Sequence, residues 1–157
     1  HFPDALQFMK EDQGLDLVRF YAYFPYPVMR PYGKGFSQML YRWWHPDHLK
    51  LYMYSDHPHL RRSCFFEKFG RYPEGVRPDK TEYTMAVRFI QRGGKALFYN
   101  AFTTLFYQKN EGDETSTIGR VVWRQQKDPL TLFMRWCYLK IRLIKTTLDV
   151  GFKNTRR

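Results

Sequence analysis

The sequence predicts a mainly α fold, in which residues 1–157 form a single small helical domain with extended arms and a long C-terminal helix. A length of 157 residues is typical of one domain and short for two. Prolines and glycines are concentrated in two stretches, which divide extended segments from helical ones. Near the C-terminus a capping residue, a proline and a later glycine bound one periodic apolar segment, which is the clearest helix signal in the chain.

The N-terminal part is predicted to be a short helix followed by an extended arm. Asp4 is placed to cap the helix, and Gly14 to end it. Residues 23–36 then form the arm, because closely spaced prolines and glycines do not permit regular structure there. The arm is too apolar for a solvated linker, so we expect it to lie in a groove of this chain or of a partner.

Two further helices are predicted in the middle of the chain. Pro46 and Pro58 each stand at a first-turn position near an aspartate, and proline is favoured at the start of a helix. Gly70 is expected to end the second helix. Residues 71–79 contain two more prolines and a glycine, and are predicted to be a connector.

Residues 81–107 fit two different structures. Read at helical spacing they give two apolar faces separated by Gly93 and Gly94, which predicts a helical hairpin. Read at strand spacing, apolar residues from Tyr83 to Phe89 alternate with their neighbours, and the two glycines form a hairpin turn. We prefer the helices. The alternative is an α+β fold with a β-hairpin around residues 81–107.

The C-terminal docking helix is predicted over residues 129–150. Asp128 is the cap, Pro129 the first helical residue, and Gly151 follows the last periodic residue. Such a helix is about 33 Å long. One apolar stripe steps alternately by four and three residues, and we expect it to face the core of the domain. Its members are Leu130, Met134, Cys137, Ile141, Ile144 and Leu148.

A second apolar stripe lies roughly opposite the first on this helix. One core cannot cover both faces, so we expect the second stripe to bind a partner or to lie partly in lipid. Its members are Leu132, Trp136, Leu139, Leu143 and Val150. Aromatic residues make up 19% of the chain, which also favours burial against other chains. From the loops and the arm we add Trp43, Trp44, Tyr26 and Tyr32 to the predicted partner-binding residues.

The chain is strongly basic, with 26 Lys and Arg against 15 Asp and Glu and a net charge of +11. From Gly119 to the end there are ten basic residues and two acidic ones, a local charge of +8. An acidic neighbour is therefore expected. Anionic lipid such as cardiolipin, or phosphate, is predicted to contact Arg135, Lys140, Arg142 and Lys145. Interleaved cations and aromatic rings also suit RNA, which is the alternative partner.

Several classes of protein lack support in the sequence. Cys64 and Cys137 are too few and too far apart for a disulfide framework or a four-cysteine zinc site. The histidines between His45 and Cys64 match no metal-ligand spacing, so we predict no metal and no cofactor. No catalytic motif is present, which argues against an enzyme. No uncharged apolar run is long enough for a transmembrane helix.

The whole chain resembles in type the accessory subunits of mitochondrial inner-membrane complexes. It is small, basic and rich in Tyr, Phe and Trp, with proline-bearing arms and no active-site motif. The resemblance implies a structural or assembly subunit of a respiratory or ATP synthase complex, associated with the inner membrane and bound to other subunits. A start at His1 would agree with a removed presequence, as it would with a trimmed or incomplete sequence. The alternative is a ribosomal, or mitoribosomal, protein that contacts RNA.

Overall fold

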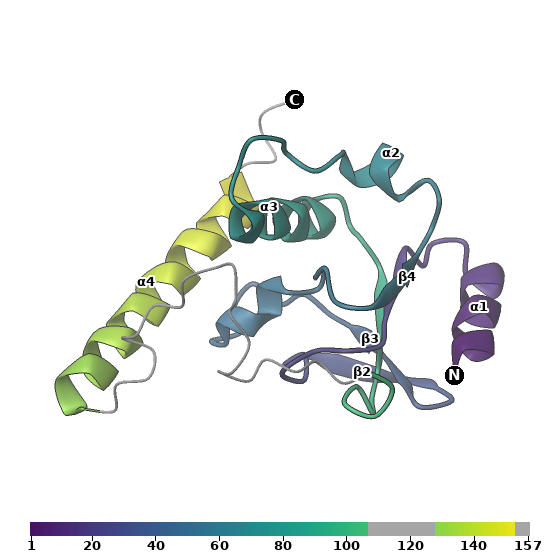
Figure 1. Cartoon of the computed structure of the whole chain (residues 1–157), viewed down its shortest axis with the longest axis horizontal. Helices are drawn as coiled ribbons and strands as arrows, with labels where there is room; N and C mark the ends of the chain where they lie inside the picture. Colours follow the sequence, from purple (N-terminus) through teal and green to yellow (C-terminus); the bar gives the residue numbers. More distant parts are fainter. Residues whose placement is uncertain (107–127, 153–157) are drawn as a thin grey trace.

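The computed structural model describes residues 1–106 and 128–152. Within these residues the chain is an α+β protein, with a five-stranded mixed sheet, four α-helices and one short 3₁₀ helix, η1 (Figure 1). The mainly α prediction is therefore wrong. The strands in spatial order are β2 (Met29–Gly33), β3 (Phe36–Met39), β5 (Ala96–Tyr99), β1 (Leu17–Arg19) and β4 (His59–Arg61).

Strands β1 and β5 form the buried centre of the sheet. They are parallel, with Leu17 opposite Ala96, and the outer pairs of the sheet are antiparallel. Every residue of β1 and of β5 is buried. A strand covered on both faces lacks the alternation of polar and apolar residues by which strands are recognised, so β1 was not predicted, and β5 lies where helices were preferred to the alternative β-hairpin.

Helices cover both faces of the sheet. Helix α1 (Phe2–Glu11) packs Phe8 against the face that carries Val18 and Leu97. Helices α2 (Phe65–Phe69) and α3 (Pro78–Gln91) cover the opposite face. Figure 1 shows α1 and α3 on different sides of the strands. Two ring-rich cores result, one on each face of the sheet.

The predicted arm at 23–36 is partly in the sheet, because it contains strand β2 and the first residue of β3. Pro31 lies within strand β2 at the edge, where proline is tolerated because one side of the strand needs no donor. Tyr26 is only 4% exposed, and its hydroxyl donates to the carbonyl of Lys50 at 2.6 Å. This segment therefore lies against its own chain, which was one of the two expected locations.

The helix predicted at Pro46 is reduced to η1 (His48–Leu51), which Asp47 caps by accepting from the amide of Leu49. The helix predicted at Pro58 is wrong, because strand β4 follows that residue. Gly70, in the left-handed region at φ 84°, does end α2. A proline restricts the backbone but does not by itself require a helix. The segment after Pro58 instead pairs with the edge of β1 as strand β4.

Neither structure proposed for residues 81–107 is right as a whole. Its first half lies in helix α3, and its second half includes strand β5. Gly93, at φ 65°, ends the helix, and Gly94 passes so close to Phe89 that a Cβ there would be 2.6 Å from the ring. The two glycines thus join a helix to a strand. The last residue of this range, 107, lies outside the described residues.

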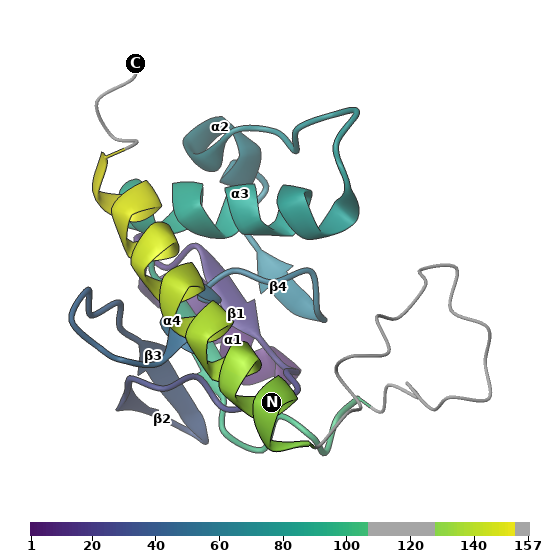
Figure 2. The ribbon, with the colours of Figure 1, turned by 90° about the vertical axis from the view of Figure 1, so that its left-hand side faces the viewer.

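The C-terminal helix is confirmed as α4 (Pro129–Phe152). The amide of Thr131 donates to the carboxylate of Asp128 at 2.9 Å, which is the predicted cap. The helix crosses one side of the molecule, in front of α3 and the sheet in Figure 2. It contacts α3 and η1 and leaves its first turns away from the sheet (Figure 1).

Candidate functional site

Asp149 attaches the C-terminal end of α4 to helix α3. Its carboxylate accepts a hydrogen bond from the hydroxyl of Tyr83 at 2.7 Å and pairs with Lys145 at 2.9 Å. Its main-chain carbonyl accepts from the side-chain amide of Gln91 at 2.9 Å. Burial, followed by the hydrogen bond to Asp149, raises the pKa of Tyr83, so this hydroxyl remains a donor at neutral pH.

A second attachment lies about two turns earlier on α4. Arg142 donates to the hydroxyl of Tyr52 at 2.6 Å, and Thr146 is buried at 2% exposure. Leu139 and Leu143 are half-buried on the same side of the helix. The side of α4 that faces the rest of the chain is therefore held mainly by polar contacts.

The predicted roles of the two stripes on α4 are not those in the structure. The stripe expected to face the core is exposed, so that prediction is wrong. Its members are Leu130 (69%), Met134 (63%), Ile141 (66%), Ile144 (60%) and Leu148 (49%), with Cys137 half-buried. In the stripe expected to bind a partner, Leu139, Leu143 and Val150 are half-buried on the domain side, and Leu132 and Trp136 are exposed. The reason is that hydrogen bonds from Tyr83 and Gln91 to Asp149 determine which side of α4 faces the chain, and the periodicity of the sequence does not specify this.

The exposed stripe and its neighbours define what we call the outer face of α4. Besides the stripe it contains Phe133, which is 61% exposed, and, at its margin toward the facing part of the chain, Tyr138, which is 50% exposed. By the period of the α-helix, Lys140 lies about 80° to one side of the stripe and Lys145 about 60° to the other. Lys140 Nζ is 5.6 Å from the centroid of the Trp136 ring. The outer face is therefore apolar along its middle, with Lys140 at one margin and the ion pair of Lys145 with Asp149 at the other.

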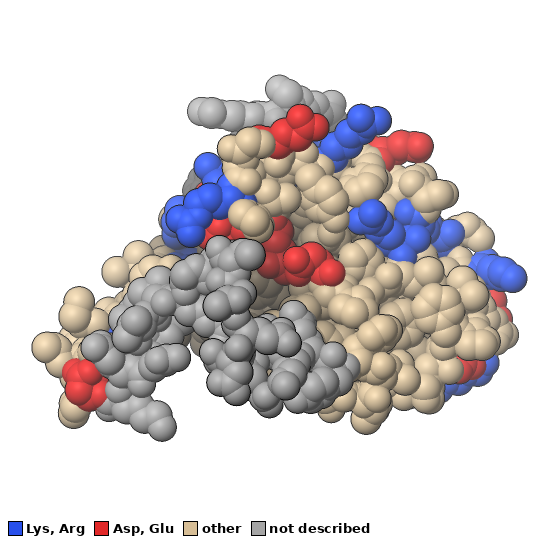
Figure 3. Space-filling model, in the orientation of Figure 1, with Lys and Arg blue, Asp and Glu red and all other residues tan. Residues whose placement is uncertain are grey.

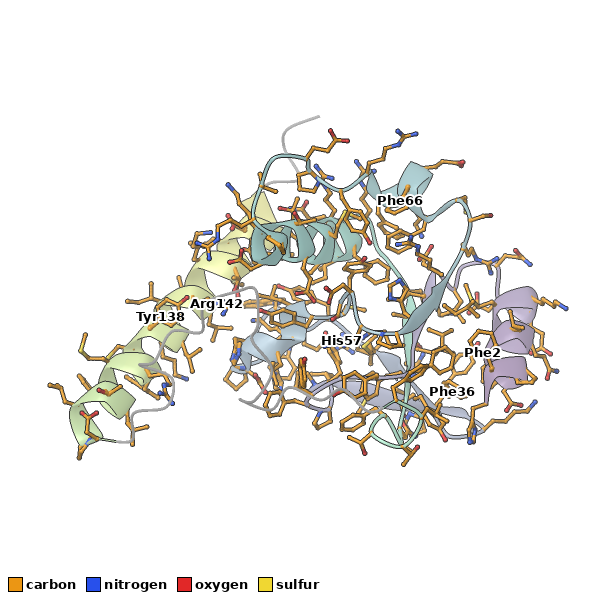
Figure 4. All side chains as sticks on the ribbon, viewed as in Figure 1. Phe2, Phe36, His57, Phe66, Tyr138 and Arg142 are labelled. Atoms are coloured by element: carbon orange, nitrogen blue, oxygen red, sulfur yellow. The ribbon has the colours of Figure 1, made fainter. Side chains whose placement is uncertain are left out.

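A groove of about 1350 Å³ separates α4 from the segments around η1. Tyr138 and Arg142 line it from α4, and His57 lines it from the facing part of the chain (Figure 4). Acidic and basic side chains meet near the start of α3 above the groove, whereas the lower right of this face is largely uncharged (Figure 3). The lining residues from α3 include Asp79, Lys80 and Glu82.

Arg19 lies at the bottom of this groove and is only 3% exposed. Its guanidinium donates to the main-chain carbonyls of Tyr52 and Tyr21 and lies 5.7 Å from the centroid of the Phe98 ring. Burial lowers the pKa of Arg19 to about 10, so the group is still protonated at neutral pH. Sequence reasoning missed Arg19, although a single arginine within the apolar run from Leu15 to Phe24 was a signal.

A serine and a histidine meet at the wall of the groove. Ser55 Oγ is 2.7 Å from His57 Nδ1, and it also accepts from the amide of His57. Ser55 is 2% exposed, and both contacts span two residues, so the arrangement is a local turn rather than an accessible nucleophile. Burial lowers the pKa of His57 and of His59, and raises that of Glu82. Burial therefore favours the neutral form of each of these three side chains.

The predicted residues outside α4 are scattered. Trp43 and Trp44 are 70% and 62% exposed, beyond the end of β3. Tyr32 is half-buried with its ring 5.1 Å from that of Phe8, centroid to centroid. Tyr26, buried in the chain's own core, is withdrawn as a partner-binding residue. Arg135 is half-buried on α4.

In residues 1–106 and 128–152, no group of three or more His, Cys, Asp or Glu side chains is arranged to hold a metal ion. The same part of the chain contains no helix with the length and apolar content needed to cross a bilayer. No protein-family model, curated protein or solved structure matches this chain.

Proposed function

We propose that this chain is a non-catalytic accessory subunit of a larger membrane-associated assembly, and that it attaches through the outer face of α4. The observation that carries the proposal is the exposure of that face. Five side chains of one stripe are 49% to 69% exposed, and two aromatic side chains beside them, Phe133 and Tyr138, are at least half exposed. Contiguous apolar surface of this kind marks an interaction site on a water-soluble body.

Burial of this face would supply enough free energy for docking. Complete burial of a leucine, isoleucine or methionine side chain contributes about 1.5 to 3 kcal/mol, and these side chains are roughly half to two-thirds exposed. Each therefore has roughly 1 kcal/mol or more still to gain. The opposite side of α4 is already held by Tyr83, Gln91 and Tyr52, so docking requires no change in the fold.

The mitochondrial inner membrane and a respiratory or ATP synthase complex are the location and assembly we propose, on the whole-chain resemblance alone. The exposed pair Trp43 and Trp44 would add a second contact with a neighbouring subunit. Contact with RNA is less well supported. Arg142 and Lys145 already bind Tyr52 and Asp149, and an apolar stripe separates Lys140 from Lys145, whereas a phosphate backbone favours a continuous basic strip.

Sedimentation of the tagged chain from cells extracted in mild detergent tests the proposal. The wild-type chain is expected in a large particle that survives ribonuclease, and Ile141→Glu/Ile144→Glu is expected to move it to the small, free fraction. Leu6→Glu/Val76→Glu is the matched control, because both residues are exposed apolar side chains away from α4.

A particle that ribonuclease collapses would replace the proposal with the RNA-binding alternative. Equal co-sedimentation of the Ile141→Glu/Ile144→Glu variant with the wild type would exclude the outer face of α4 as the attachment surface.

A further inference from the structure

We infer that an anionic lipid surface covers the outer face of α4, with the helix axis lying in the plane of the membrane interface. The inference rests on the proposed docking role of α4 and names the chemistry of what it docks on. Three observations carry it: the distribution of apolar and basic side chains around the helix, the net positive charge of the helix, and the open position of α4 in the molecule.

The side chains are distributed around α4 as on a helix that lies in a bilayer interface. The exposed stripe from Leu130 to Leu148 would enter the acyl boundary. Lys140 and Lys145, one at each margin, have long apolar stems that keep their ammonium groups at the level of the lipid head groups. Tyr138 lies beside the stripe, and a ring with one polar end is favoured at that level.

The charge of α4 selects anionic lipid. Helix α4 has four cations, Arg135, Lys140, Arg142 and Lys145, and one carboxylate, Asp149, which pairs with Lys145 at 2.9 Å, so its net charge is +3. The chain as a whole carries +11. Neutral lipid would bury the apolar stripe only, whereas an anionic surface would also attract the basic side chains beside the stripe.

A second copy of this chain is a poorer occupant of the same face. The stripe has the alternating four-and-three spacing of a coiled-coil seam. In a parallel pair, Lys140 of each copy would lie opposite Lys145 of the other, and the Asp149 carboxylate that pairs with Lys145 at 2.9 Å offsets only part of this repulsion. In an antiparallel pair, lysines again meet lysines. Self-association through this face is therefore opposed by charge.

The position of α4 leaves the face accessible to a surface. In Figure 2 the helix lies across the front of the molecule, with α3 and the sheet behind it. Contacts to Tyr52, Tyr83 and Gln91 come from the opposite side of the helix. A helix crossing the bilayer would bury Lys140, Arg142 and Lys145 in hydrocarbon, which is costly, so an orientation in the interface is favoured.

Vesicle flotation of the purified full chain tests the inference. We expect binding to phosphatidylcholine vesicles that contain about 30% phosphatidylglycerol, and much weaker binding to phosphatidylcholine alone. Lys140→Gln/Lys145→Gln is expected to weaken partition into the anionic vesicles roughly 25-fold, since each lysine near the surface accounts for about fivefold. Ile141→Ser/Ile144→Ser is expected to lower binding to both kinds of vesicle.

The matched charge control is Lys10→Gln/Arg30→Gln, which removes two exposed cations from α1 and β2 and should change partition less than about twofold. Far-ultraviolet circular dichroism checks that each variant is folded. Equal binding of the wild type to neutral and anionic vesicles would overturn the inference. An equal loss of binding to anionic vesicles in Lys140→Gln/Lys145→Gln and in Lys10→Gln/Arg30→Gln would also overturn it.

The result also separates this inference from the proposed function. If the wild type binds no vesicle, yet Ile141→Glu/Ile144→Glu still releases the chain from its particle in cells, a protein neighbour covers the face and the lipid inference is wrong. If substitutions on the outer face change neither vesicle binding nor sedimentation with the particle, both proposals fail.

Discussion

The sheet domain, residues 1–106, and helix α4 are stabilised in opposite ways. In the sheet domain Phe65, Phe69, Phe89 and Phe98 are at most 1% exposed and pack against one another. On α4 the largest apolar side chains point away from the chain, and the attachment depends on Asp149 and Arg142. Helix α4 is thus held in place by these polar contacts and the half-buried Leu139, Leu143 and Val150, while the apolar side chains of its outer face remain available for docking.

The largest expected difference between the two regions is the cost of removing a phenylalanine ring. Phe89→Ala should lower the free energy of unfolding by about 3 to 5 kcal/mol, because it leaves a cavity among buried rings. Phe133→Ala, on the outer face and 61% exposed, should change it by less than about 0.5 kcal/mol. Urea denaturation measures both. Similar losses would mean that the outer face is already covered within the chain.

Replacing a glycine with alanine should lower the free energy of unfolding in the sheet domain and raise it in helix α4. Gly94→Ala would place a Cβ 2.6 Å from the Phe89 ring and should cost about 1 to 3 kcal/mol. Gly151→Ala meets nothing within 4 Å and lies in helix α4, so it should stabilise the helix by up to about 1 kcal/mol. Thermal unfolding of the two variants measures the effect. A stable Gly94→Ala variant would contradict the close packing between α3 and β5.

The attachment of α4 can be loosened without unfolding the sheet. Tyr83→Phe removes the hydrogen bond to Asp149 and should reduce protection of α4 amides by about 1 to 2 kcal/mol in hydrogen exchange. Protection in β1 and β5 should be unchanged. Tyr99→Phe serves as the control, because Tyr99 is a buried tyrosine on the other face of the sheet. Equal loss across the sheet would show that the two regions unfold as one unit.

Mild acid should have the smallest effect, and it should act on the sheet domain. Burial lowers the pKa of His57 and of His59 below the ordinary 6.5, with Arg19 adding to both shifts. The unfolded chain therefore takes up protons first as the pH falls through that value, so stability is present above it and declines below it. Glu82, whose pKa burial raises, acts in the opposite direction at lower pH. The urea midpoints of the wild type and of His57→Gln/His59→Gln, measured at pH 7.5 and pH 6, check this. A variant whose midpoint changes with pH as much as that of the wild type would refute it.

The features that could be predicted from the sequence are those that depend on neighbouring residues. Asp128, Pro129 and the periodic residues that follow them fix the start of α4 within the chain itself, and Gly70 ends α2 for a similarly local reason. Strand β1 could not be predicted, because three buried residues have no period and their partner, Ala96, is far along the chain. Pairing of that kind is decided by tertiary contact.

The candidate site was predicted in part for the same reason. Periodicity gave both apolar stripes of α4, but the choice between them depends on Tyr83 and Gln91, which lie on another helix. The basic margins at Lys140 and Lys145 follow from the helical period. The groove with the buried Arg19 could not be predicted, because it depends on the sheet, and no local sequence pattern specified the sheet.

Site-specific photo-crosslinking in cells tests the central claim most directly. A benzophenone side chain in place of Ile144 would report what lies against the outer face of α4, and the same group in place of Leu6, on α1, is the control. The account predicts covalent adducts, with lipid or with a neighbouring subunit, at position 144 and few at position 6. Adducts at position 6 with none at position 144 would mean that the outer face is not the docking surface.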